Sequence, residues 1–271
     1  MGDPRGFLKV RTRRELAERP VEERIKDWFD VHAETGLQPW TQAQAARCMD
    51  CGTPFCMTGC PLGNLIPEWN DLVRQGKWED AYNRLSMTNN FPEVTGRICP
   101  ALCEQACVLG IHQPPTMIRN DECTIIDQAW DLDIVKPLPP QRLTDQTVAV
   151  VGSGPAGLSA AYQLALKGHE VTIKEGSPEA GGMMRYGIPK YRLPRRVLDQ
   201  EIARILDLGV KLELNTTSQR QGKRKERTSE DLCAPWKAKK SLCSAVKLSF
   251  TAAAIPLSTS LVLPSVWVLS L

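Results

Sequence analysis

Seven cysteines in two short groups constrain this chain most. The first group lies in CMDCGTPFCMTGC, which begins at Cys48, and the second lies in CPALCEQAC, which begins at Cys99. The N-terminal stretch MGDPRGFLKVRTRRELAERP has no apolar segment of a secretory leader, so we expect a reducing compartment. There, clustered cysteines bind metal more often than they form disulfides. We therefore expect the N-terminal part to fold around a metal centre.

The spacing of the cysteines indicates which metal centre. The groups read C-x2-C-x4-C-x3-C and C-x3-C-x3-C, with a proline after Cys60 and after Cys99. A cysteine run that ends in Cys-Pro is similar to the ferredoxin pattern, in which the fourth cysteine serves a different cluster from the first three. The seven cysteines fit two clusters with eight ligand positions, so one ligand is of another kind. They are Cys48, Cys51, Cys56, Cys60, Cys99, Cys103 and Cys107.

Zinc remains an alternative, because thiolates bind zinc as readily as iron. The cysteines alone leave the two open, and a redox domain beside them favours iron–sulfur clusters. We expect Cys123, Cys233 and Cys243, which lie outside the pattern, to be ordinary thiols.

A second motif follows in VAVVGSGPAGLSAAYQLALKGHEVTIKEG, which reads as strand, glycine turn, helix and strand. Its glycines form G-x-G-x-x-G directly after the first strand, and Glu175 closes the second strand. In this context the glycines let the backbone approach a pyrophosphate and let the helix pack on the strand, and the acidic residue accepts from ribose hydroxyls. The predicted nucleotide site contains Gly152, Gly154, Pro155, Ala156, Gly157 and Glu175.

The motif does not choose between FAD and a nicotinamide nucleotide. The following segment GGMMRYGIP, with Gly182 and Met183, favours FAD, because a glycine pair and an irregular loop suit a backbone pressed against a bulky ring system.

These patterns predict an α+β multidomain chain. Residues 1–145 form an all-α iron–sulfur domain, and residues 146–217 form a partial Rossmann-like α/β FAD-binding domain after the Pro-rich linker VKPLPPQRLTDQ. Within the first domain, the spacing of Val21, Ile25, Trp28, Phe29 and His32 predicts a helix. Between the cysteine groups, apolar residues that include Trp69, Val73 and Leu85 predict two short helices. Residues 218–271 form an atypical tail.

The composition is that of a folded protein, and the C-terminal tail differs from the rest of the chain in its charge. Of the 271 residues, 42% are hydrophobic and 24% are charged, which is typical of globular proteins. The formal charge is +3, and from Ser218 onward nine Lys and Arg face three Asp and Glu. The basic run 223–225 is too short to indicate nucleic-acid binding, and Pro256 and Pro264 argue against a membrane span. We expect no nucleic-acid or membrane partner, and a cytoplasmic location.

With both motifs in this order, the chain resembles the small (β) subunit family of NADPH-dependent glutamate synthase and the related N-terminal part of dihydropyrimidine dehydrogenase. The resemblance runs from about residue 6 to about residue 215. It is carried by CMDCGTPFCMTGCPLGNLIPEWNDLV, TNNFPEVTGRICPALCEQACVLGI, VAVVGSGPAGLSAAYQLALKGHEVTI and GGMMRYGIPKYRLP.

The resemblance implies two [4Fe–4S] clusters, FAD and NADPH. It assigns Cys48, Cys51, Cys56 and Cys107 to one cluster, and Cys60, Cys99, Cys103 and Glu122 to the other. It also implies an electron path from NADPH through FAD and the clusters to a large (α) subunit, which makes glutamate from glutamine and 2-oxoglutarate.

The chain departs from the family after about residue 217. The family continues with a second glycine fingerprint for NADPH, which the tail SQRQGKRKERTSEDLCAPWKAKKSLC does not contain. We therefore expect a truncated chain that lacks the NADPH-binding domain and whose tail is disordered or out-of-frame. The alternatives are a non-catalytic iron–sulfur electron-transfer or interaction module, or a flavoprotein subunit that serves another reductase.

Overall fold

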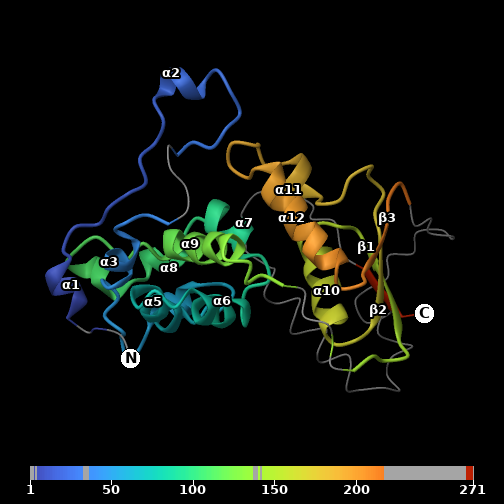
Figure 1. Cartoon of the computed structure of the whole chain (residues 1–271), viewed down its shortest axis with the longest axis horizontal. Helices are drawn as coiled ribbons and strands as arrows, with labels where there is room; N and C mark the ends of the chain where they lie inside the picture. The colour runs from blue at the N-terminus through green and yellow to red at the C-terminus, as the bar shows by residue number, and fades with distance from the viewer. Residues whose placement is uncertain are drawn as a thin grey trace, which may run out of the picture. The chain divides into compact units, whose positions relative to one another are not determined.

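The computed structural model describes residues 3, 5–32, 37–136, 140, 142–216 and 267–270. These residues belong to one compact unit. An N-terminal part made mainly of helices is followed by a part that combines helices with a sheet (Figure 1).

The N-terminal part consists of short helices joined by tight turns. They are α1 (Gly6–Lys9), α2 (Val21–Arg24), α3 (Thr41–Ala45), α4 (Phe55–Gly59), α5 (Ile66–Arg74), α6 (Trp78–Ser86), α7 (Pro92–Ile98), α8 (Leu102–Gln105), the 3-10 helix η1 (Val108–Ile111) and α9 (Ile118–Asp131). Prolines begin α7 and lie in the first turn of α5, where their missing N–H costs nothing. Between α5 and α6, Gly76 has a φ of +71° and allows the chain to reverse.

Helices α5, α6 and α9 enclose the core of this part. Trp69, Val73, Leu85 and Ile125 are fully buried there. The apolar positions of α5 and α6 recur at three- and four-residue spacing, which buries one face of each helix. The two helices that the sequence indicates between the cysteine groups are therefore present.

The α/β part is built on a four-stranded sheet. Its elements are β1 (Thr147–Val151), α10 (Pro155–Leu166), β2 (Glu170–Lys174), α11 (Met183–Tyr186), α12 (Arg195–Leu206), β3 (Lys211–Glu213) and β4 (Trp267–Ser270). The strand order is β3-β2-β1-β4, and β1, β2 and β3 are parallel. The β4 backbone pairs antiparallel with β1, with residue 148 opposite residue 270.

The two parts share a hydrophobic core. Phe91 and Val94 from the N-terminal part are buried with Leu158 and Ile202 of the α/β part. At the same boundary the Arg204 guanidinium donates to the backbone carbonyl of Asn90 at 3.2 Å. Packing therefore continues across the sequence boundary near residue 145.

The helix predicted from Val21 to His32 is mostly wrong. Only Val21–Arg24 is helical, and Ile25, Trp28 and Phe29 are 76%, 67% and 75% exposed. Helical spacing stabilises a helix mainly when its apolar face packs against something, and this face has little cover. Instead Arg19 pairs with Asp27 at 2.5 Å and closes a loop.

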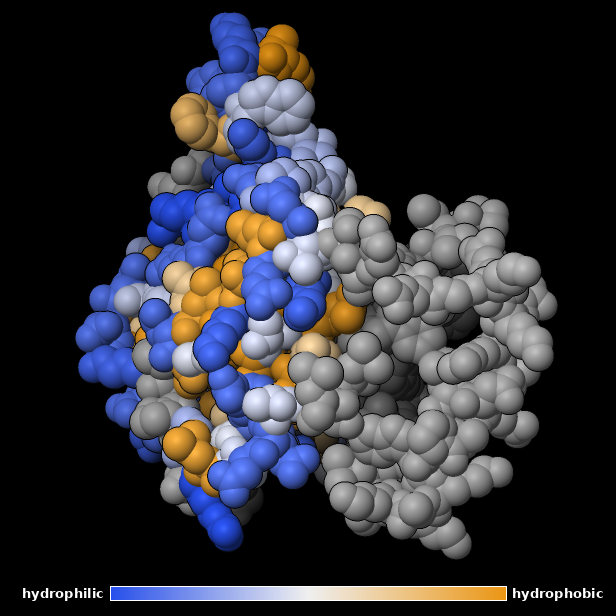
Figure 2. All heavy atoms as spheres, turned by 90° about the vertical axis from the view of Figure 1, so that its right-hand side faces the viewer, coloured by the Kyte–Doolittle hydropathy of each residue, from blue (hydrophilic) through white to orange (hydrophobic). Residues whose placement is uncertain are grey.

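The surface gives no indication of a membrane-spanning segment among the described residues. None of their helices is long and apolar enough to cross a bilayer. On the face in Figure 2, hydrophobic residues form patches within a mainly hydrophilic described surface.

Of the tail at 218–271, only the strand Trp267–Ser270 is described. The predictions for the rest of the tail, including Cys233 and Cys243, lie outside the described residues.

Candidate functional site

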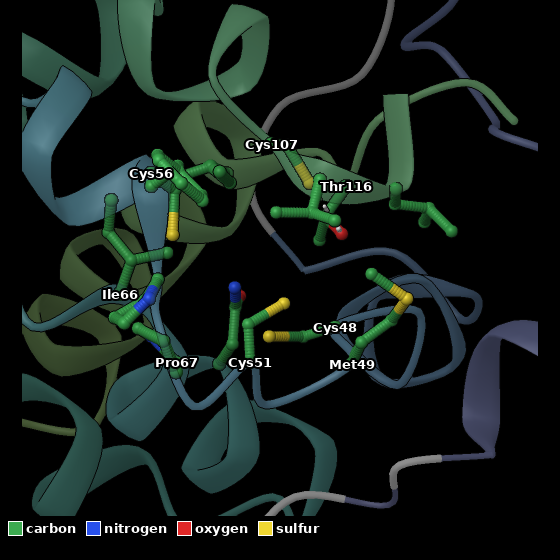
Figure 3. Close-up of a pocket in the computed structure, with 14 residues that line it drawn as sticks. Cys48, Met49, Cys51, Cys56, Ile66, Pro67, Cys107 and Thr116 are labelled. Atoms are coloured by element: carbon green, nitrogen blue, oxygen red, sulfur yellow. Dashed lines mark hydrogen bonds between the residues drawn. The ribbon is translucent and has the colours of Figure 1, made fainter. Parts of the chain in front are cut away.

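Four cysteines from the two sequence groups line one pocket. Cys48 and Cys51 lie in the loop after α3, Cys56 lies in α4, and Cys107 immediately precedes η1. Figure 3 shows the sulfur atoms of these four cysteines facing the same space. The structure therefore brings Cys107 to the first group and leaves Cys60 out of this pocket.

The rest of this pocket is mainly apolar. Ile66 and Pro67 from α5, Leu109 from η1 and Ile118 from α9 line it beside the cysteines. Burial, with a smaller contribution from the other cysteines, raises the pKa of Cys48 to about 12 and that of Cys56 to about 11. Thiolates are thus costly here unless a cation accompanies them.

Neither a single-ion metal site nor a disulfide is found among the described cysteines. Within the described residues, no three His, Cys, Asp or Glu side chains lie close enough together to hold one metal ion. None of the eight cysteines that the structure describes forms a disulfide.

The remaining predicted ligands form a second set. Burial raises the pKa of the Cys103 thiol, and the nearby acids Glu104 and Glu122 and the thiol of Cys60 raise it further. Burial likewise raises the pKa of Cys99, with Glu122 and Cys60 contributing. These four groups, Cys60, Cys99, Cys103 and Glu122, therefore lie near one another, although they come from four separate segments.

Two glycines allow this convergence. A Cβ on Gly59 would lie 2.7 Å from the Ala106 Cβ, so α4 can approach α8 only without a side chain there. A Cβ on Gly96 would lie 2.8 Å from the Cys123 Cα, which sets the same condition for α7 and α9. These close helix contacts bring Cys60 and Cys99 near Glu122.

Glu122 is buried and held by two hydrogen-bond donors. The Thr95 hydroxyl and the Asn89 amide, the latter at 3.1 Å, both donate to its Oε1 atom. Burial raises the pKa of Glu122 to about 7, and the two hydrogen bonds oppose this rise. A carboxylate oriented in this way can serve as an oxygen ligand.

Left-handed backbone occurs in both cysteine loops. Asp50, between Cys48 and Cys51, has a φ of +50°, and Ala101, between Cys99 and Cys103, has a φ of +57°. Non-glycine residues adopt this conformation at a cost and often do so at functional sites. At Ala101 the backbone N–H thereby reaches the Cys99 Sγ atom at 3.4 Å.

The glycine motif forms the turn from β1 into α10. Gly152 has a φ of +94°, and a Cβ on Gly152 or Gly154 would meet no atom within 4 Å, so this turn faces open space. A Cβ on Gly157 would instead lie 1.9 Å from the Gly152 carbonyl oxygen. Pro155 and Ala156 form the first turn of α10, whose free backbone N–H groups favour an anion. The turn is therefore suited to a pyrophosphate.

Glu175 lies at the end of β2 and supports this turn. Its Oε2 accepts from the Ser153 backbone N–H at 2.7 Å and from the Ser153 hydroxyl at 2.5 Å, and its Oε1 accepts from the Ser177 N–H at 2.8 Å. Burial disfavours ionisation, but these hydrogen bonds outweigh it and keep the pKa of Glu175 below its usual value. The sequence predicted only a ribose contact and missed this bracing role.

The second glycine pair packs onto the same turn. The Gly181 N–H donates to the Ser153 carbonyl and hydroxyl oxygens, both at 3.1 Å. A Cβ on Gly182 would lie 2.8 Å from the Gly154 Cα, and Gly182 has a φ of +50°. Met183, which begins α11, is 59% exposed.

Comparisons with known proteins indicate an iron–sulfur domain followed by a nucleotide-binding domain. Residues 24–134 match a family model described as dihydropyrimidine dehydrogenase domain II, 4Fe-4S cluster, and residues 150–209 match one described as NAD(P)-binding Rossmann-like domain. The chain is 57% identical over 202 residues to a glutamate synthase [NADPH] small chain from Mycobacterium tuberculosis and 45% identical over 225 residues to one from Bacillus subtilis. Over these residues the chain is a homologue of glutamate synthase small chains.

In each comparison, the aligned region covers a larger share of this chain than of its relative. It takes in 74% of this chain and 41% of the Mycobacterium tuberculosis relative, and 80% and 45% for the Bacillus subtilis relative. The chain thus spans less than half the length of these relatives. A glutamate synthase [NADH] from Schizosaccharomyces pombe is 44% identical over 220 residues, which is 10% of that protein. The family models thus give this chain an iron–sulfur domain followed by a Rossmann-like nucleotide-binding domain.

Proposed function

We propose that this chain is an electron-transfer oxidoreductase subunit of glutamate synthase, which holds two [4Fe–4S] clusters and FAD. Its partner is the large chain, which makes glutamate from glutamine and 2-oxoglutarate, and NADPH is the source of electrons. The likeness to glutamate synthase small chains supports the assignment. The observation that carries it is the convergence of Cys107 with Cys48, Cys51 and Cys56 on one apolar pocket.

The proposed ligands divide into two crossed sets. Cys48, Cys51, Cys56 and Cys107 hold the first cluster, and the second set contains Cys60, Cys99, Cys103 and Glu122. The mutual effects on the pKa values of the thiols in each set support this division. Each cluster then joins both cysteine groups, so that binding the clusters stabilises the whole N-terminal part.

The proposed FAD site is the glycine turn. The backbone at Gly152 and Gly154 approaches the pyrophosphate, the start of α10 supplies N–H donors, and Glu175 accepts from the ribose. Gly182 and Met183 lie beside this turn and border the flavin side. When bound, the flavin and clusters convert hydride oxidation into single-electron transfer. The protein's contribution is to position these groups and to exclude water from the first pocket.

Quantifying the cofactors tests this function. After anaerobic purification we expect equal amounts of iron and acid-labile sulfide, sufficient for two clusters per chain, with flavin absorption and dithionite-bleachable absorption. Cys123→Ala is the matched control, because Cys123 belongs to neither ligand set and should leave the iron content unchanged. A colourless protein loaded with zinc would rule out this function.

We also propose a cytoplasmic location, since reduced thiols and iron–sulfur clusters persist best in a reducing environment. Binding to the large chain is tested by co-purification with that chain. Absence of a complex, with both clusters present, would favour a flavoprotein subunit that serves another reductase.

A further inference from the structure

Asn70 is a fully buried amide without a partner. It lies in α5 with 0% of its surface exposed, and neither its Oδ1 nor its Nδ2 atom has a hydrogen-bond partner among the described residues. Buried amides in folded proteins are almost always hydrogen-bonded, because an unpaired donor or acceptor is costly. An asparagine in such a position therefore indicates a partner that the protein chain itself does not supply.

Asn70 lies on the face of α5 that borders the first pocket. Ile66 and Pro67 precede it by four and three residues and line the same pocket, so the three side chains share one helix face. Ile66 also packs into the hydrophobic core with Trp69 and Val73, so this side of α5 borders both the core and the pocket. The asparagine is thus a polar residue on an otherwise apolar helix face that meets the four cysteines.

The other residues around the pocket do not satisfy this amide. Apart from the cysteines, Asn70 and Thr116, the pocket is lined by hydrocarbon and thioether side chains. The Thr116 hydroxyl lies 3.9 Å from the Cys107 Sγ atom. Sulfur accepts hydrogen bonds from N–H groups, and it becomes a better acceptor when it carries negative charge. The NH2 group of the Asn70 amide can therefore donate a hydrogen bond to an electron-rich sulfur.

We propose, on the basis of the two-cluster function above, that the Asn70 amide donates an N–H···S hydrogen bond to a sulfur of the first cluster. Adding an electron makes the cluster sulfurs more negative, so this bond strengthens on reduction. Hydrogen bonds to sulfur are one of the means by which proteins set cluster potentials. Asn70 therefore raises the reduction potential of the first cluster and leaves that of the second unchanged.

The test is a redox titration of the cluster-loaded chain, followed by electron paramagnetic resonance. Asn70→Leu keeps a similar volume and removes the donor, so one of the two midpoint potentials should fall while the other stays. A tenfold loss of electron affinity corresponds to 59 mV for a one-electron couple. Asn70→Asp keeps the shape, removes the donor and adds negative charge, so it should lower the same potential further.

Asn64→Leu is the matched control. Asn64 is also buried, but its Oδ1 accepts from the Thr88 hydroxyl at 2.7 Å, and it does not line the first pocket. This variant should leave the first cluster's potential unchanged. In the cluster-free chain, Asn70→Leu should melt at the same or a higher temperature than wild type, because the leucine removes an unpaired amide.

Three outcomes separate the hypotheses. Two clusters in the wild type, with unchanged potentials in both Asn70 variants, overturn the role of Asn70 and leave the proposed function standing. A lower melting temperature of the cluster-free Asn70→Leu chain, with unchanged potentials, assigns Asn70 a structural role instead. A wild-type chain that binds no cluster overturns both the proposed function and the role of Asn70.

Discussion

A single added methyl group at Gly157 should strongly destabilise the α/β part. Its Cα faces the turn that precedes α10, and an added Cβ would lie 1.9 Å from the Gly152 carbonyl oxygen and 3.0 Å from its carbonyl carbon. Contacts under 3.0 Å are essentially never seen, so backbone atoms must move by about 1 Å. Overpacking typically costs about 1–3 kcal/mol, and a backbone clash belongs at the upper end.

For Gly157→Ala we therefore expect a loss of about 3 kcal/mol in the free energy of unfolding. In a protein of this size that corresponds to a fall of about 6–12 °C in melting temperature. The assay is thermal unfolding of the flavin-free chain, followed by circular dichroism. A fall of less than about 2 °C would show that the helix and turn do not pack as described.

Gly154→Ala is the matched control for this substitution. Gly154 has a φ of −67°, and its Cβ would meet no atom within 4 Å, so the fold can accept the methyl group. As the residue before the first turn of α10 it costs at most about 1 kcal/mol. Since that methyl group would occupy the face proposed for the pyrophosphate, flavin binding should weaken while the melting temperature changes little.

Two further substitutions test buried charges of the α/β part. Glu201→Ala leaves Arg204, whose side chain is 6% exposed, without its carboxylate partner, and should cost about 3–5 kcal/mol by urea unfolding. The double variant Glu201→Leu with Arg204→Leu should recover most of that loss. A cost below about 1 kcal/mol in the free energy of unfolding for Glu201→Ala alone would contradict the pairing. Glu175→Gln should cost about 2 kcal/mol at pH 7, because Ser153 and Ser177 donate to a charged acceptor. The folded pKa of Glu175 lies below its unfolded value, so its stabilisation is present above about pH 4.3 and disappears as the pH falls through the folded pKa. Equal pH dependence of wild type and Glu175→Gln below pH 4.3 would refute this role.

Local sequence signals predicted the beginning of the α/β part. Apolar strand segments and the glycine motif placed β1, α10 and β2, because these signals depend on a few neighbouring residues. The spacing of Trp69, Val73 and Leu85 indicated α5 and α6, whose buried faces it reports directly. The same reasoning failed at Val21–His32, because periodicity describes a helix face but not whether another element covers it.

The candidate sites required long-range information. Spacing alone suggested two cysteine groups, whereas the place of Cys107 beside Cys48 depends on the packing of α4, α8 and α9. Asn70 was missed entirely. A signal was present, since an asparagine follows Ile66 and Pro67 on one apolar helix face, but its meaning depends on what that face meets.

The crossed assignment of ligands is the central claim, and the iron content of two double variants tests it directly. Cys56→Ala with Cys107→Ala removes two ligands of the first cluster, so the chain should retain about half of the wild-type iron. Cys103→Ala with Cys107→Ala removes one ligand from each cluster, so nearly all of the iron should be lost. If each cysteine group held its own cluster, the results would be reversed: the first pair would lose nearly all of the iron and the second pair would keep half.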